Sequence, residues 1–258
     1  MAAIYSESAL TDDATASLEA LKGERYIATK EFNVLPDQDA EFEKEWATRA
    51  TALAPLEGFR FFSLFKRLGP AGESGESNYL SMTVWENKNA FEAFGADGEE
   101  ESIAGVAGKP VTASYEGLIP EVGASFTPEK RAESDDGDQI TSDIFAGINR
   151  FSIKAGKETE FEQKWATRDA QMSIIPGFVS FYLLRREASE ADDGNNYSVI
   201  SIWKSGKDFE DWRSTEGFAA AFARTGGVDA AYAASAYNGP PNATGYAGKL
   251  TVVSPLGP

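Results

Sequence analysis

The sequence contains neither cysteine nor histidine among its 258 residues. Without cysteine it forms no disulfide, thiolate nucleophile or iron–sulfur cluster, which excludes a secreted disulfide scaffold and favours a reducing interior. Without histidine it lacks the commonest acid–base group near neutral pH, the usual ligand of zinc and haem iron, and the base of Ser-His-Asp catalysis. Any site chemistry must therefore use other residue types.

Long apolar runs and basic residues are also scarce. No apolar run approaches the roughly 20 residues of a membrane-spanning helix, and the start MAAIYSESALTDD has no basic or apolar signal region. With 24 basic against 41 acidic residues the formal charge is -17, which repels nucleic-acid phosphates and anionic lipids. We expect a soluble, intracellular protein of the cytoplasm or plastid stroma, with no nucleic-acid or membrane partner.

An internal repeat dominates the sequence. Residues 31–67 match residues 150–186 at a constant offset (161 − 42 = 119), with an identical Glu-Phe-Glu and an identical Trp-Ala-Thr-Arg. The match resumes one residue shorter beyond a loop, where Trp85 pairs with Trp203 (203 − 85 = 118). The repeat predicts a tandem duplication of one module, and the 42% hydrophobic content is ample for two cores.

Each copy predicts the order strand, helix, strand, strand, helix, strand. The strands are rich in β-branched and aromatic residues, and the first helix carries apolar residues at three- or four-residue spacing. The third strand of each copy is apolar on both alternations, which indicates helices over one face and a second sheet over the other. The predicted strands are 26–35, 59–67, 79–85, 111–115, 144–153, 178–186, 197–203 and 232–237, and the helices lie near 42–53, 91–94, 161–172 and 209–222.

The repeat also predicts the domain boundaries. The two α+β modules span residues 25–119 and 144–237. Between them, residues 120–143 are acidic and poor in large apolar residues, which is typical of a linker. An N-terminal extension, 1–24, and a Gly/Pro-rich C-terminal tail, 238–258, are expected to lie outside the repeat.

The order of elements, with PGFVSFYLLRR and YSVISIWKSGKDFEDWRSTEGFAAAFA, resembles the antibiotic-biosynthesis-monooxygenase superfamily of ferredoxin-like modules. Within it, the sequence is most similar to the small haem-degrading monooxygenases. The resemblance implies an α+β fold in which two ferredoxin-like modules pack sheet to sheet as an intramolecular dimeric α+β barrel. It covers both repeats.

The same resemblance implies candidate site residues in the second module. Haem degraders of this type use an asparagine on the first strand, a tryptophan ending the third and an axial histidine on the last helix. Asn149 and Trp203 match the first two, whereas the histidine position falls on Phe222, which would be part of the pocket wall. In the first module Trp85 matches, but Lys30 replaces the asparagine. The iron ligand is therefore missing from both copies.

Each candidate also has a structural interpretation. Trp203 and Trp85 either shape a cofactor pocket, with Trp203 in its wall beside Phe222, or are core residues of a two-faced strand, and the core role is favoured. Asn149 either binds an oxygen intermediate or satisfies a backbone group. In the repeated WATR segment, tryptophan is expected to fill the helix–sheet interface and arginine to reach a carboxylate at the module boundary. The residues concerned are Trp46, Arg49, Trp165 and Arg168.

Three further features have alternative interpretations. The acidic clusters Glu99–Glu101 and Asp135–Asp138 lack the ligand alternation of a calcium loop, so we expect solvated acid and no metal. Tyr197 or Tyr232 would be a tyrosinate or a haem ligand in an enzyme. The NAT sequence at Asn242 is a glycosylation pattern of low specificity.

These observations lead to two functional hypotheses of different classes. The first is a non-catalytic, self-assembling structural or scaffold component without a cofactor. Its partner would be the chain itself or other proteins, and in this role the chain resembles a pyrenoid-shell-type lattice protein of algal plastids. The alternative is a haem-degrading or cofactor-independent monooxygenase, with haem as the cofactor in the first case and with its pocket in the second module. A small-ligand-binding module without turnover is a third class.

Overall fold

The two sequence repeats fold into two modules in the computed structural model of the chain. The structure describes residues 19–69, 77–95, 105–123, 126, 143–167, 172–187, 194–219 and 230–258. The first module consists of β1 (Arg25–Phe32), α1 (Asp39–Ala50), η1 (Thr51–Leu53), β2 (Phe59–Arg67), β3 (Tyr79–Trp85), α2 (Lys88–Ala93) and β4 (Val111–Val122). The second consists of β5 (Phe145–Phe151), α3 (Glu158–Ala166), η2 (Met172–Ile174), β6 (Phe178–Arg186), β7 (Tyr197–Trp203), α4 (Gly206–Arg213), α6 (Ala230–Ala236) and β8 (Asn242–Val253).

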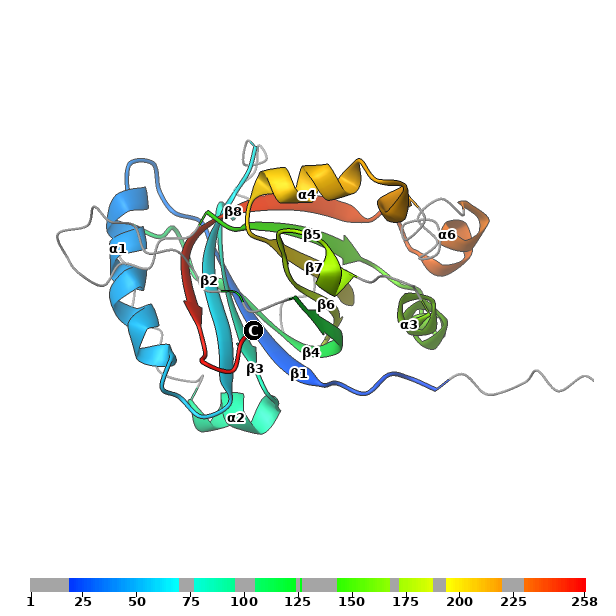
Figure 1. Cartoon of the computed structure of the whole chain (residues 1–258), viewed down its shortest axis with the longest axis horizontal. Helices are drawn as coiled ribbons and strands as arrows, with labels where there is room; N and C mark the ends of the chain where they lie inside the picture. Colours follow the sequence, from blue (N-terminus) through cyan, green and yellow to red (C-terminus); the bar gives the residue numbers. More distant parts are fainter. Residues whose placement is uncertain are drawn as a thin grey trace, which may run out of the picture.

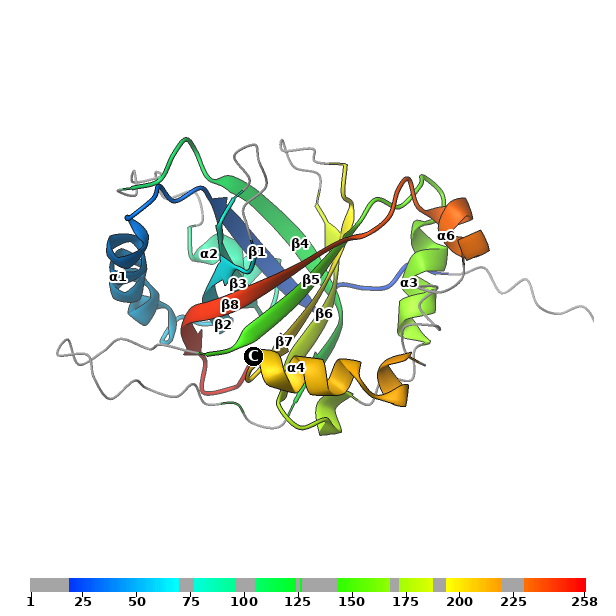
Figure 2. The same cartoon turned by 90° about the horizontal axis from the view of Figure 1, so that it is seen from above.

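All eight strands form one closed antiparallel barrel, which confirms the predicted fold. The strand order is β1-β3-β2-β8-β5-β7-β6-β4 (Figures 1 and 2). Two seams join the modules, because β4 pairs with β6 and β8 pairs with β2. Moving four places along the order takes each strand to its counterpart in the other module. The modules are therefore related by an approximate half-turn about the barrel axis.

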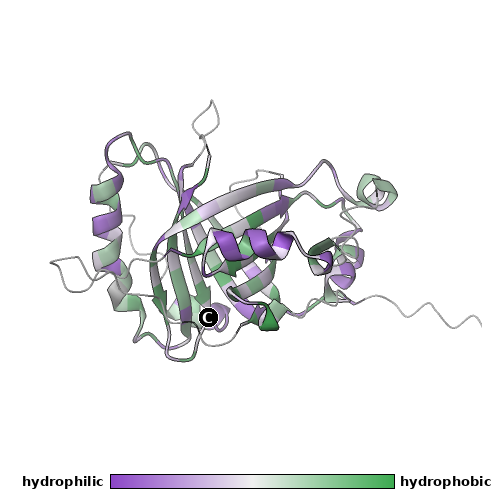
Figure 3. Ribbon diagram, turned by 45° about the horizontal axis from the view of Figure 1, so that its top comes forward, coloured by the Kyte–Doolittle hydropathy of each residue, from purple (hydrophilic) through white to green (hydrophobic). Residues whose placement is uncertain are grey.

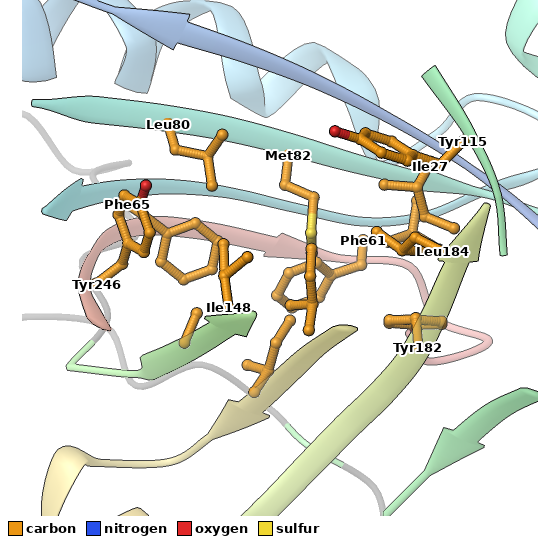
Figure 4. Close-up of a cluster of buried hydrophobic side chains, with 14 of the residues drawn as sticks. Ile27, Phe61, Phe65, Leu80, Met82, Tyr115, Ile148, Tyr182, Leu184 and Tyr246 are labelled. Carbon is orange, nitrogen blue, oxygen red and sulfur yellow. The ribbon is translucent and has the colours of Figure 1, made fainter. Parts of the chain in front are cut away.

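Three hydrophobic layers follow from the alternation of side chains along the strands. One face of every strand points into the barrel, where Ile27, Met82, Ile148 and Leu184 from both modules converge (Figure 4). The outer face of the first module packs under α1 and α2, and that of the second under α3, α4 and α6. Figure 3 shows hydrophilic residues along the outward side of α4, in contrast to the mainly hydrophobic strands. Among the described residues, no helix is long and apolar enough to cross a membrane.

The C-terminal part of the prediction was wrong. Residues 232–237, predicted as the last strand, lie mostly in helix α6, and the last strand is β8 within the predicted tail 238–258. The run AAYAASA consists largely of alanine, the strongest helix former, whereas the Gly and Asn of β8 are poor strand formers. Pairing with β2 and β5 on either side makes β8 a strand.

A further match between the modules confirms this placement of β8. Tyr115 and Gly117 of β4 correspond to Tyr246 and Gly248 of β8 at a single offset (246 − 115 = 131). The offset exceeds that of the preceding strands because more residues separate α4 from β8 than separate α2 from β4. In the first module, β4 extends to Val122 and so enters residues 120–143, which were predicted as a linker. Residues 127–142 of that predicted linker lie outside the described residues.

The barrel interior becomes polar toward one end. Arg150 of β5 donates to Glu31 of β1 at 2.7 Å, and the Tyr246 hydroxyl lies 3.4 Å from Arg150. Both charged residues line a cavity of about 10 Å³ together with Thr29 and Ser198, which is about the space of one water molecule.

Tyr182 is a polar residue deep in the same interior. Its side chain is fully buried, and its hydroxyl forms no well-aligned hydrogen bond among the described residues. Burial raises the pKa of Tyr182 to about 12, despite smaller lowering effects of Ser180 and Arg25. The hydroxyl therefore loses its water contacts on folding without gaining a strong partner.

We predict that Tyr182→Phe leaves the free energy of unfolding unchanged or raises it by ~1 kcal/mol, because no strong hydrogen bond is lost. Tyr197→Phe is the matched control: the Tyr197 hydroxyl donates to Glu162 at 2.6 Å, so its loss should cost ~1–3 kcal/mol. Urea denaturation followed by circular dichroism measures both. Equal losses in the two variants would contradict the assignment.

Candidate functional site

Asn149 lies on the outer face of the second module. Along β5, Ala146 and Ile148 point into the barrel, so the alternate residues Gly147 and Asn149 point outward, on the side of α3, α4 and α6. The side chain of Asn149 is half-buried. Its amide is therefore directed away from the barrel core, toward the helical layer.

Small residues lie beside Asn149 on its β8 side and toward Gly147, whereas Val199 is its ladder partner on β7. Residues paired directly across a ladder share a face; Asn149 pairs with Ala243 of β8, and Gly147 pairs with Gly245 of β8 and Ser201 of β7. Ala243 is exposed. These five residues form a floor without long side chains, which we call the small-residue floor.

An aromatic cluster borders one end of the small-residue floor. Trp203 is fully buried, stacks on Trp212 at 5.0 Å between ring centroids, and has Phe178 at 5.4 Å and Phe209 at 5.9 Å. Phe145 lies directly opposite Trp203 in the ladder and stacks on Phe209 at 4.7 Å. The packing of Trp203 is thus consistent with its predicted core role. The Trp203 side chain also lies at one end of the small-residue floor.

The local sequence places α4 over this cluster. Ser205 caps the helix by accepting a hydrogen bond from the Asp208 amide, which fixes where α4 begins. Gly177 has φ of 79°, and a Cβ there would lie 2.2 Å from the Asp208 side chain, so glycine permits close approach. At Gly147, a Cβ would lie 3.4 Å from the Phe209 ring. Glycine at these two positions therefore lets α4 pack closely against the sheet.

The structure places two of the three predicted site residues on the same sheet face without bringing them into contact. Asn149 is four residues along β5 from Phe145, the ladder partner of Trp203, which places the two side chains ~13 Å apart along the sheet. The third, Phe222, lies outside the described residues. The small-residue floor occupies the interval between Asn149 and Trp203.

The first module differs at the corresponding face. Lys30 and Ala28 replace Asn149 and Gly147 (149 − 119 = 30; 147 − 119 = 28). Trp85 is buried as Trp203 is, with Phe59 at 5.6 Å and Phe94 at 5.2 Å. The two tryptophans thus share a structural role, whereas the polar residues at the equivalent positions 30 and 149 differ in charge. Glu99–Glu101 lie outside the described residues, as do Asp135–Asp138.

The described residues around Trp203 do not fit a haem iron. Its ring neighbours Phe178, Phe209 and Trp212 carry no iron-ligating atom. Burial and the Glu162 carboxylate raise the pKa of Tyr197, and burial also raises that of Tyr232. Both tyrosines hold their protons tightly, which opposes the tyrosinate form that binds iron. No group of three or more Asp or Glu among the described residues is arranged to hold a metal ion.

A buried carboxylate, Glu162, was missed by the sequence analysis. Glu162 of α3 is 1% exposed and accepts hydrogen bonds from Tyr197 at 2.6 Å, from Arg185 at 2.7 Å and from the Leu21 amide at 2.7 Å. Arg185 of β6 also donates to Glu116 of β4 at 2.5 Å. The network ties the helix, both modules and the segment before β1 together; that segment runs toward α3 in Figure 1.

The first module contains the corresponding but more exposed cluster. The Tyr79 hydroxyl lies 2.6 Å from Glu43 and 2.7 Å from Asp39 and donates to one of them at a time. Lys66 donates to Asp39 at 2.8 Å, and Lys249 of β8 lies 3.6 Å from Glu43. The presence of this cluster in both modules indicates a structural role. The repeated Glu-Phe-Glu and the paired tyrosines were the signal that could have revealed it.

The WATR prediction is partly confirmed. Trp46 stacks on Phe62 at 5.5 Å and Trp165 stacks on Phe181 at 5.9 Å, so both tryptophans fill helix–sheet interfaces as expected. Arg49 donates to Glu45, one turn earlier in the same helix, at 2.5 Å. An i, i+4 neighbour is always within reach on a helix surface. Arg168 lies outside the described residues.

Comparison with protein families gives a match over both modules. A family model described as antibiotic biosynthesis monooxygenase matches residues 25–99 and 144–224. Two curated heme oxygenases (mycobilin-producing) of Mycobacterium tuberculosis, from strains CDC 1551 and H37Rv, are each 33% identical over 73 residues, which is 28% of this chain. The match spans 66% of the length of each relative.

Solved structures share the fold at low sequence identity. A candidate monooxygenase from Lactobacillus acidophilus has a TM-score of 0.62 at 10% identity, covering 89% of this chain and 96% of its own. A second from Fusobacterium nucleatum has a TM-score of 0.61 at 13% identity, covering 91% and 95%. An anthrone oxidase-like protein has a TM-score of 0.54 at 14% identity, covering 90% and 94%.

We predict that Glu162→Ala lowers the free energy of unfolding by ~3–5 kcal/mol, because it leaves the buried end of Arg185 and the Leu21 amide without their acceptor. Glu43→Ala is the matched control and should cost ~1 kcal/mol, since Glu43 is half-exposed. Urea denaturation measures both, and limited proteolysis before Glu24 should accelerate only in Glu162→Ala. Equal costs would show that the network stabilises neither module preferentially.

We also predict unfolding at alkaline pH. Burial raises the pKa of Tyr182 and Tyr237 to about 12 and also raises those of Tyr79 and Tyr197, whereas unfolded tyrosine ionises near pH ~10. The folded chain holds these protons more tightly, so their contribution to stability is complete below pH ~10 and is lost between pH ~10 and ~12. Tyrosinate absorbance and far-UV circular dichroism should change together; titration near pH 10 with unchanged dichroism would refute the prediction.

Proposed function

The chain belongs to the antibiotic biosynthesis monooxygenase family, and from this premise we propose that its second module carries an oxygen-dependent oxidation site. The site would lie over the small-residue floor, between Asn149 and the cluster around Trp203. The supporting observation is the outward amide of Asn149 beside a floor without long side chains, a combination that Lys30 replaces in the first module. The site would therefore be present once in the chain.

The floor favours a flat, aromatic and uncharged substrate. The rings of Phe209 and Phe145 lie over Gly147 and Gly245. A planar substrate ring would therefore lie beside these two rings, next to Asn149 and the exposed Ala243, and would contact their edges and faces. The formal charge of -17 repels an anionic substrate. A hydroxylated polycyclic compound that is neutral in solution combines these properties.

Asn149 would stabilise the anion of such a substrate. Its amide would donate to a phenol or carbonyl oxygen of the substrate, which favours loss of a ring proton and produces an electron-rich anion. A four-electron oxidation by O2 would then convert a ring CH2 to C=O and release one H2O, with one oxygen atom in each product. The chain's own residues bind, orient and polarise, and O2 is the oxidant.

Haem binding is a second candidate, favoured by the identity to the mycobacterial heme oxygenases over 73 residues. Haem would supply iron-based oxygen activation if bound. The aromatic neighbours of Trp203 and the protonated tyrosines oppose ligation by the described residues. The self-assembling scaffold and the plastid location stay predictions, because none of the relatives bears on assembly or on compartment.

We predict oxygen consumption by the purified chain with hydroxylated anthrones, whose central ring carries the CH2 group that the proposed step oxidises, measured by an oxygen electrode with product identified by mass spectrometry. Asn149→Ala should lower kcat by about a hundredfold, as loss of one anion-stabilising donor does. Lys30→Ala, at the corresponding position of the first module, should change kcat by less than about twofold, in the range of a surface substitution.

A haemin titration of the same protein separates the two candidates. A Soret band that shifts on binding, with oxygen uptake that depends on haemin and a reductant, would replace the cofactor-independent proposal by the haem one. Equal loss of activity in Asn149→Ala and Lys30→Ala would contradict the placement of the site in the second module. Inactivity in both assays, with large particles in negative-stain images, would favour the scaffold hypothesis.

A further inference from the structure

Glu31 and Arg150 occupy equivalent positions in the two modules and bind each other. Their numbers differ by the repeat offset (150 − 31 = 119), and the Arg150 guanidinium donates to the Glu31 carboxylate at 2.7 Å inside the barrel. The side chain of Arg150 is 15% exposed and that of Glu31 is 32% exposed. Residues related by a half-turn meet one another only near the axis, so this ion pair marks the axis at the polar end of the barrel.

A barrel of two identical modules could not contain such a pair. Each residue near the axis would face its own copy, so two first modules would oppose Glu31 to Glu31, and two second modules would oppose Arg150 to Arg150. Like charges in a partly buried contact repel each other and cost several kcal/mol. Only the pairing of a first with a second module places opposite charges on the axis.

The two modules also complement each other in side-chain size, at two further pairs of equivalent positions. Phe61 and Ser63 of β2 correspond to Ser180 and Tyr182 of β6 (180 − 61 = 119; 182 − 63 = 119), and all four are buried. Ser63 also donates to the Leu250 carbonyl of β8, in the other module, at 2.8 Å. Large and small residues are therefore exchanged between the modules. A pair of identical modules would place two large side chains at one of these positions and two small ones at the other, which a close-packed interior tolerates poorly.

We propose that the inner sheet face of each module selects the other module, with the Glu31–Arg150 pair as the main determinant of this choice. The partner of a first module is always a second module, never a second copy of itself. Barrels of two first modules or of two second modules from different chains are therefore disfavoured. This proposal is independent of the activity proposed above.

The test uses the whole chain, cleaved at an engineered protease site between residues 128 and 138 after folding. The two halves are unfolded together in urea and refolded, and native mass spectrometry counts the pairs first–second, first–first and second–second. The preference is measured as the squared amount of first–second pairs divided by the product of the amounts of first–first and second–second pairs. For the wild type, this ratio should exceed the value for random pairing by about a hundredfold or more.

Charge variants show whether the ion pair sets the choice. Glu31→Arg removes the opposite charge from every pairing, so the preference should fall about tenfold or more, and the exchanged variant Glu31→Arg/Arg150→Glu should restore it. If Glu31→Arg does not refold after cleavage, Glu31→Gln gives the same comparison with a smaller expected fall. Lys207→Glu, which breaks an exposed ion pair with Asp211 on α4, is the control and should leave the preference unchanged.

Two results would overturn the proposal. The first is a statistical mixture of pairs for the wild type, which would show that the inner faces do not discriminate. The second is a preference that the charge-exchanged double variant fails to recover relative to Glu31→Arg, which would show that the ion pair is not the determinant. Preference in the wild type with loss and recovery in the variants supports it.

Discussion

Closure of the barrel across two seams is the constraint on which the rest of the structure depends. A four-stranded sheet has two edges with unpaired backbone groups, and here the other module covers both, through β4 with β6 and β8 with β2. Each sheet is then buried on both faces, by the barrel interior and by its helices. The apolar character of both sides of β3 and β7 follows from this burial, because neither module covers its own inner face.

Duplication within one chain lets the two outer faces differ while the barrel is kept. A homodimer would carry two copies of every site, whereas this chain has asparagine on one floor and lysine on the other. The tryptophan that ends each floor is retained and buried in both modules because it fills the space between sheet and helix. The residues needed for packing are thus shared, and those available for chemistry are not.

The missing histidine limits the chemistry that the family fold can perform in this chain. The tyrosines near α3 remain protonated because burial and nearby carboxylates raise their pKa values, and Glu162 is fully engaged by Arg185, Tyr197 and Leu21. Among the described residues, the amide of Asn149 points to the outer face of the second module, and in the proposed function it would stabilise a substrate anion rather than ligate iron.

The sequence alone determined the duplication, the order of elements as far as β7, and the buried roles of Trp85 and Trp203, because these depend on local periodicity and on a repeat offset that is visible in one dimension. It also identified Asn149 as a candidate. Only the tertiary structure made β8 a strand, since its pairing partners are distant in sequence. The same holds for the Glu31–Arg150 ion pair, because an alignment shows that two positions are equivalent but not that a half-turn brings them into contact.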